Sequence, residues 1–70
     1  MPIPNTPPRD LVDRIRMEFI EMPGLSLTGP QASRLWNLDA GLCDAVLAAL
    51  ILEQFLSRSR GGAYLRRTDN

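Results

Sequence analysis

Four arginines surround a pair of glycines, Gly61-Gly62, near the C-terminal end of the chain: Arg58, Arg60, Arg66 and Arg67. A guanidinium can donate two parallel hydrogen bonds to one phosphate, and arginines beside a glycine-rich tip can reach the backbone or the narrow minor groove of a duplex. Charged residues on an exposed hairpin also serve simply to keep sheet edges from aggregating. The pattern favours phosphate binding over that second role.

The remaining reactive groups indicate no catalytic or metal site. The chain has one cysteine and no histidine, so it cannot form an internal disulfide, and a zinc site is not expected. Cys43 lacks a neighbouring histidine or lysine that would lower its pKa, and we interpret it as a small buried apolar residue. The carboxylates are spread among arginines and form no acid–base pair. We therefore expect no enzyme, no cofactor, no metal and no small-molecule substrate.

Composition is that of one small folded domain. The chain has 70 residues, 44% of them hydrophobic, and a formal net charge of zero, which argues against a strongly basic nucleic-acid binder. The charge is uneven, because residues 57–70 carry four of the eight basic residues and only one acid, Asp69. No apolar run reaches the length of a membrane span, and the first residues do not resemble a signal peptide. We expect a cytoplasmic protein that does not contact a membrane.

The middle of the chain predicts two short helices joined by a tight turn. Thr28 and Gln31 have the spacing of a capping box, and Pro30 falls in the first turn that follows. Asp39 is suited to cap the second helix, since its carboxylate can accept from free amides two and three residues on. The apolar faces of the two helices are Ala32, Leu35 and Trp36, then Cys43, Val46, Leu47, Leu50 and Ile51. This is the pattern of a helix-turn-helix unit.

The flanking segments complete the predicted core. Residues 1–8 contain four prolines and form an extended arm, after which a helix runs to Pro23-Gly24 with an inner face of Leu11, Val12, Ile15, Phe19 and Met22. Residues 25–27 are a short extended segment able to pair with a later strand. Residues 55–67 predict a β-hairpin around the two glycines, which tolerate positive φ. Its register leaves open whether Tyr64 or Leu65 faces the core. Residues expected to be mostly buried are Leu11, Ile15, Phe19, Leu35, Trp36, Val46, Leu47, Leu50 and Leu56.

In this order of elements the chain resembles the winged helix-turn-helix superfamily of prokaryotic DNA-binding domains. The resemblance covers residues 9–67, between the arm at 1–8 and a tail at 68–70. It is carried by EMPGLSLTGPQASRLWNLD, by the leucine-rich helix after it, and by FLSRSRGGAYLRR as the wing. It implies an α+β fold, mainly α, with three helices, a C-terminal β-hairpin wing and a short strand near residues 25–27. It also implies that the helix over residues 40–52 enters the major groove of DNA while the hairpin touches the backbone or the minor groove.

Two functions follow from this resemblance and from the residues. The first is weak DNA binding with little sequence specificity, typical of a small transcription regulator, through Gln31, Ser33, Arg34, Arg58, Arg60, Arg66 and Arg67. However, the outer face of the helix over residues 40–52 offers no arginine, lysine, asparagine or glutamine to read a base edge. The alternative is a module for protein–protein contact or homodimerisation that does not bind DNA. Its predicted contact face is Ala45, Ala48, Ala49 and Leu52.

Overall fold

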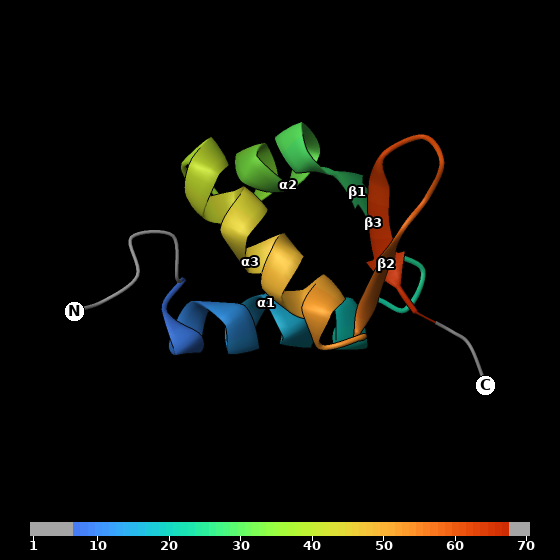
Figure 1. Cartoon of the computed structure of the whole chain (residues 1–70), viewed down its shortest axis with the longest axis horizontal. Helices are drawn as coiled ribbons and strands as arrows, with labels where there is room; N and C mark the ends of the chain where they lie inside the picture. The colour runs from blue at the N-terminus through green and yellow to red at the C-terminus, as the bar shows by residue number, and fades with distance from the viewer. Residues whose placement is uncertain (1–6, 68–70) are drawn as a thin grey trace.

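Three helices and a three-stranded antiparallel sheet make up the protein, which is described here from a computed structural model covering residues 7–67. The helices are grouped at one end, and the sheet closes the other end (Figure 1). In chain order the elements are α1 (Arg9–Glu21), β1 (Ser26–Thr28), α2 (Gly29–Leu35), α3 (Ala40–Leu52), β2 (Leu56–Arg58) and β3 (Ala63–Arg66). The α+β, mainly helical class is as expected. Of the predicted arm only Pro7 and Pro8 are described, and residues 68–70 lie outside the description.

Helix α1 buries the side chains that recur along one of its faces. Val12, Ile15 and Phe19 are buried, and Leu11 packs against them at the edge of the core. Met22, which we expected on this face, is 44% exposed. The reason is that the helix ends at Glu21. Met22 leaves helical geometry with φ of −126°, although its N–H still donates to the Glu18 carbonyl.

Helix α2 begins with the predicted capping box. The Thr28 hydroxyl accepts from the Gln31 N–H at 3.3 Å, and the Gln31 side-chain oxygen accepts from the Thr28 N–H at 2.9 Å. The turn after α2 passes through Asn37, whose φ of 54° is left-handed. Asp39 then caps α3, because its carboxylate accepts from the N–H groups of Gly41 and Leu42. Both predicted caps are confirmed.

The prediction that Leu35 is buried is wrong, because this side chain is 55% exposed. Helix α2 has seven residues, and its buried side is centred on Ala32, with Trp36 half-buried one turn later. Leu35 falls at the edge of that side, beside Leu27 of β1. The Trp36 ring packs edge-on against Phe19, with centroids 5.9 Å apart. At this end of α2, Trp36 therefore packs against the core, and Leu35 lies outside the core.

The sheet has the order β1-β3-β2, so the first strand pairs with the last. Ser26 lies opposite Leu65, and Arg58 lies opposite Tyr64. The predicted short strand is thus confirmed, shifted by one residue to Ser26–Thr28. Of the two hairpin glycines only Gly62 has a positive φ, 88°. This register packs Tyr64 against the core.

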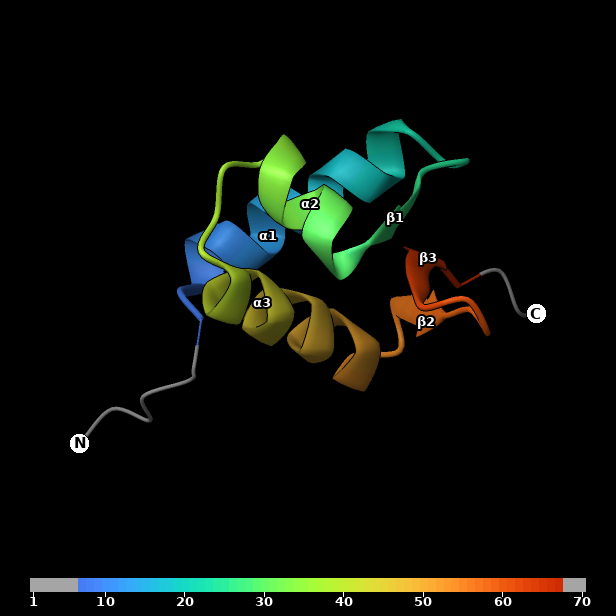
Figure 2. The ribbon, with the colours of Figure 1, turned by 90° about the horizontal axis from the view of Figure 1, so that it is seen from above.

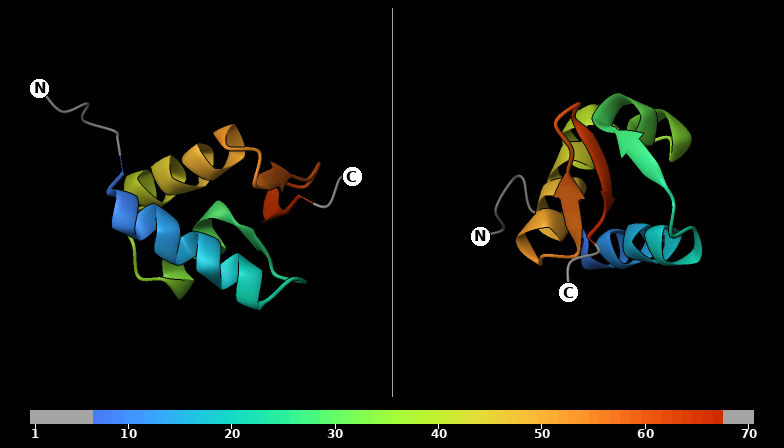
Figure 3. Two further views of the ribbon diagram at one scale, coloured as in Figure 1. Left: turned by 90° about the horizontal axis from the view of Figure 1, so that it is seen from below. Right: turned by 90° about the vertical axis from the view of Figure 1, so that its right-hand side faces the viewer.

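Figures 2 and 3 show the arrangement of the three helices and the sheet from three further sides. The core joins buried side chains from all three helices and from β2. Its buried members are Val12, Ile15, Phe19, Ala32, Cys43, Val46, Leu47, Leu50 and Leu56. They include six of the nine residues expected to be buried. Leu11 and Trp36 are half-buried instead. Within residues 7–67 no single helix is both long and apolar enough to cross a membrane. Only the pair α2–α3, bent by 112° at its break, meets that length and composition.

Candidate interaction surfaces

Helix α3 presents an exposed stripe on the side opposite its buried face. Cys43, Val46, Leu47 and Leu50 point into the core. The exposed residues recur at intervals of three or four, which places them on one side of the helix: Gly41, Asp44, Ala48 and Leu52. Leu52 is 84% exposed, the highest value among the exposed large hydrophobic side chains of residues 7–67. Of the predicted protein-contact face, Ala48 and Leu52 are exposed, while Ala45 and Ala49 are half-buried.

A groove runs between the C-terminal half of α3 and the hairpin. Its volume is about 410 Å³, and it is lined by Ala48, Ile51 and Leu52 from α3, Arg58 from β2 and Tyr64 from β3. The Arg58 guanidinium carbon lies 5.5 Å from the centroid of the Tyr64 ring, so the cation rests over the aromatic face. Apart from that cation and the tyrosine hydroxyl, the groove is built from apolar side chains. Sequence reasoning found Ala48 and Leu52 but missed Tyr64, because its orientation depends on the strand register.

The predicted DNA-contacting arginines have different surroundings. Arg58 and Arg60 are exposed on the hairpin, and Arg34 is exposed on α2. Arg66 is half-buried, with its guanidinium carbon 5.6 Å from the centroid of the Phe55 ring. Arg67 is exposed, and its N–H donates to the Phe55 carbonyl at 2.9 Å. Of the five arginines, Arg34, Arg58, Arg60 and Arg67 are thus exposed, while Arg66 is half-buried beside Phe55.

The two polar candidates on α2 already take part in local structure. The Gln31 side chain belongs to the capping box that starts the helix. The Ser33 hydroxyl donates to the carbonyl of Leu38, which ties the end of α2 to the turn before α3. Both side chains thus bond within α2 and the turn that follows it.

The side chain of Asp44 lies close to Gly29, the first residue of α2. A Cβ atom added to Gly29 would lie only 3.3 Å from Oδ1 of Asp44, so this close approach favours glycine at position 29. Gly29, Arg34 and Asp44 are among the residues lining a cleft of about 510 Å³ between α2 and α3. A carboxylate here repels any phosphate that approaches the start of α2. The pKa of the Cys43 thiol is raised, first by burial of the thiol and second by the negative charge of Asp44.

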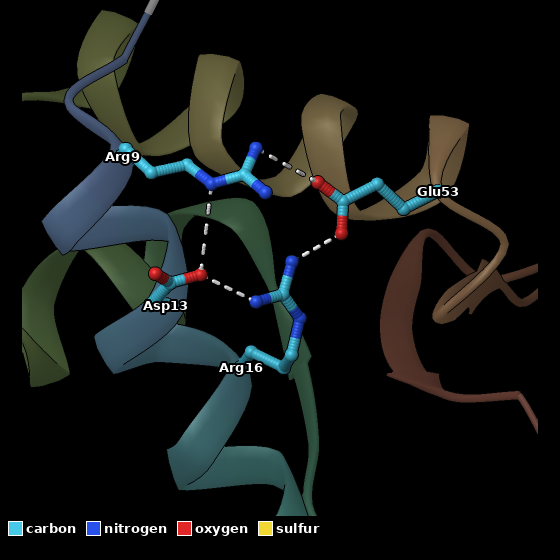
Figure 4. A network of polar contacts seen from close by, with 4 residues as sticks. All are labelled: Arg9, Asp13, Arg16 and Glu53. Carbon is cyan, nitrogen blue, oxygen red and sulfur yellow. Dashed lines mark hydrogen bonds and ion pairs between the residues drawn. The ribbon is translucent and has the colours of Figure 1, made fainter.

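Four charged side chains join α1 to the end of α3 (Figure 4). Arg16 donates hydrogen bonds to both Asp13 and Glu53, and Arg9 lies within 4.0 Å of the same two carboxylates. The hydrogen bonds to Glu53 and then Asp13 raise the pKa of Arg16. Asp13 and Arg16 are three residues apart on α1, a spacing at which oppositely charged side chains meet on a helix surface. Arg9 and Glu53 could not be found in that way, since Glu53 is 37 residues from Arg16. The network connects the residue just after Leu52 to α1.

Comparison of the chain with protein-family models, with curated proteins and with solved structures gives no match.

Proposed function

We propose that the chain is a winged helix-turn-helix domain that works by protein contact, through the groove between α3 and the hairpin. The order helix, strand, helix, helix, hairpin supports the fold assignment, as does the pairing of the short first strand with the hairpin. The 112° bend between α2 and α3 lies within the range of about 90–120° found in helix-turn-helix units. The hairpin then corresponds to the wing, and α3 to the helix that DNA-binding relatives insert into the major groove.

The exposure of Leu52 carries the functional proposal. This side chain is 84% exposed at the rim of a groove whose other walls are Ala48, Ile51 and Tyr64. An exposed apolar patch bordered by polar residues is typical of a protein-binding site. Tyrosine and arginine, both present in the groove, are also the residue types enriched at energetically important interface positions. A protein that packs its own apolar side chains against this groove removes Leu52 from water.

The charge of α3 supports the same proposal. Its exposed stripe carries one charged residue, Asp44, and no side chain that donates hydrogen bonds to a base edge. Asp39, just before the helix, uses its carboxylate as the N-cap, and Glu53, just after it, bonds to Arg16. Within α3 itself the only charged residue is therefore the acidic Asp44, which repels a phosphate backbone.

Weak DNA binding is a second candidate, favoured by the exposed cations Arg34, Arg58 and Arg60. Without base contacts, affinity would come from neutralised phosphates, with Kd on the order of 10⁻⁴–10⁻⁶ M at physiological salt. Each arginine that leaves a true phosphate contact would flatten the plot of log K against log salt by about 0.9. For either role we propose a cytoplasmic location, as expected from the sequence.

An NMR titration with a short duplex of random sequence, at several salt concentrations, separates the two functions. We expect the amide signals of residues 29–36, 40–52 and 57–67 all to stay in place even at low salt. Asp44→Asn is the matched variant, because it removes the carboxylate from α3 and adds a donor without changing the size of the side chain. Saturable, salt-sensitive shifts in any of these three segments that strengthen with Asp44→Asn would overturn the protein-contact proposal in favour of DNA.

A further inference from the structure

We infer that the cleft between α2 and α3 binds a small zwitterion, an apolar α-amino acid, between Arg34 and Asp44. This site goes beyond the proposed function and is separate from the groove, whose α3 residues begin at Ala48. The volume of the cleft, about 510 Å³, falls within the range of about 300–1,000 Å³ that is typical of small-molecule sites. The amino acid is bound as a ligand and is not converted.

The two charged side chains of the cleft have opposite signs and are not paired. Within residues 7–67, neither the Arg34 guanidinium nor the Asp44 carboxylate forms a side-chain hydrogen bond or an ion pair. An anion alone would be attracted by Arg34 and repelled by Asp44, and a cation alone would meet the reverse. A molecule that carries both an ammonium and a carboxylate satisfies both side chains.

The spacing of the two charges fits the ammonium and the carboxylate of one α-amino acid. Oδ1 of Asp44 lies beside Gly29, which places the acidic end of the cleft at the first residue of α2. Arg34 follows five residues later, about 7.5 Å along the helix axis. An α-amino acid holds its nitrogen about 3 Å from its carboxylate oxygens, and a charge-assisted hydrogen bond of about 2.8 Å at each end extends this reach to about 8–9 Å. The flexible Arg34 side chain takes up the remaining difference.

The remaining lining of the cleft favours an apolar side chain on the amino acid. Pro30, Leu38 and Ala40 contribute apolar groups, and Leu38 also packs against the core. The side-chain amide of Asn37 forms no hydrogen bond within the described residues, so it is available to the ammonium or the carboxylate of the ligand. The Ser33 hydroxyl already donates to the Leu38 carbonyl and can only accept. A charged side chain on the ligand would find no partner once the two charges of the cleft are engaged.

NMR titration of the full chain with free glycine, alanine, valine, leucine and methionine tests this inference, with the amide signals as the readout. We expect at least one of the larger apolar amino acids to shift the signals of residues 29–44 saturably, with a dissociation constant of about 1 mM or below. The N-acetyl derivative of that amino acid lacks the ammonium, and its amide lacks the carboxylate. Each derivative should bind about tenfold more weakly or worse, because one charge of the cleft then stays unpaired.

Two charge-removing variants locate the site. Arg34→Gln and Asp44→Asn should each raise the dissociation constant about tenfold or more. Arg14→Gln and Asp10→Asn make the same changes at exposed positions of α1 and should leave the dissociation constant unchanged. Amide spectra of the free variants show which are folded, and the two derivatives test the wild-type chain without any variant.

Two results overturn the inference: signals of residues 29–44 that move with none of the amino acids, or derivatives that bind as tightly as the amino acid itself. Unchanged binding to folded Arg34→Gln and Asp44→Asn overturns it as well. None of these results depends on the groove between α3 and the hairpin, so the proposed function stands or fails separately.

Discussion

Two leucines on α3 show how neighbouring residues of one type have opposite roles. Leu47 is 0% exposed and lies in the core cluster, whereas Leu52 is 84% exposed beside the groove. Their spacing of five residues places them on different sides of the helix. The free energy of folding therefore depends on Leu47, and Leu52 is available for contact with a partner.

Truncating each leucine to alanine separates these roles. Leu47→Ala should lower the free energy of unfolding by about 2–5 kcal/mol, through lost burial and the cavity left behind. A domain of this size has a stability of only about 3–5 kcal/mol, so the variant is expected to unfold partly or fully at room temperature. Leu52→Ala should change stability by less than about 0.5 kcal/mol. Urea denaturation of the two variants measures both effects, and equal losses would contradict the assigned burial.

Among the helices and strands, the features predictable from sequence are those whose causes lie within a few residues. Thr28, Gln31 and Asp39 have recognisable capping patterns, and the structure contains the bonds that the patterns imply. The predicted burial of Leu35 was wrong because a helix of two turns has too few residues to define its buried side. The Tyr64 orientation depends on hairpin register, and the Arg16–Glu53 contact joins residues 37 apart. The local spacing of residues predicts neither the orientation of Tyr64 nor the contact between Arg16 and Glu53.

The capping box gives a test at the level of the element. Thr28→Ala should reduce the free energy of unfolding by about 0.5–2 kcal/mol, because the N–H of Gln31 loses its acceptor. Thr28→Ser keeps a hydroxyl at the same position and should recover most of that loss. Thermal unfolding of the three proteins measures the difference. If alanine and serine are equally destabilising, Thr28 acts through the β1 strand and not through the cap.

For the whole molecule, the groove exists only because distant segments meet. The charged network holds the end of α3 against α1, and the register of β3 turns Tyr64 toward α3. From sequence, the composition of α3 already argued against base reading, while the arginine-rich hairpin favoured DNA. The groove adds what composition could not provide, namely that Leu52, Ala48 and Tyr64 line one surface. That surface is the basis for preferring protein contact.

The central claim is tested most directly by photo-crosslinking from inside the groove. A photoreactive amino acid replaces Ala48, or Arg14 on α1 as an exposed control, in the chain expressed in its native host. We predict that position 48 gives a protein adduct, identifiable by mass spectrometry and lost with Leu52→Asp, and that position 14 does not. An adduct destroyed by nuclease, or no adduct from position 48 beyond that from position 14, would contradict the claim that this groove binds protein.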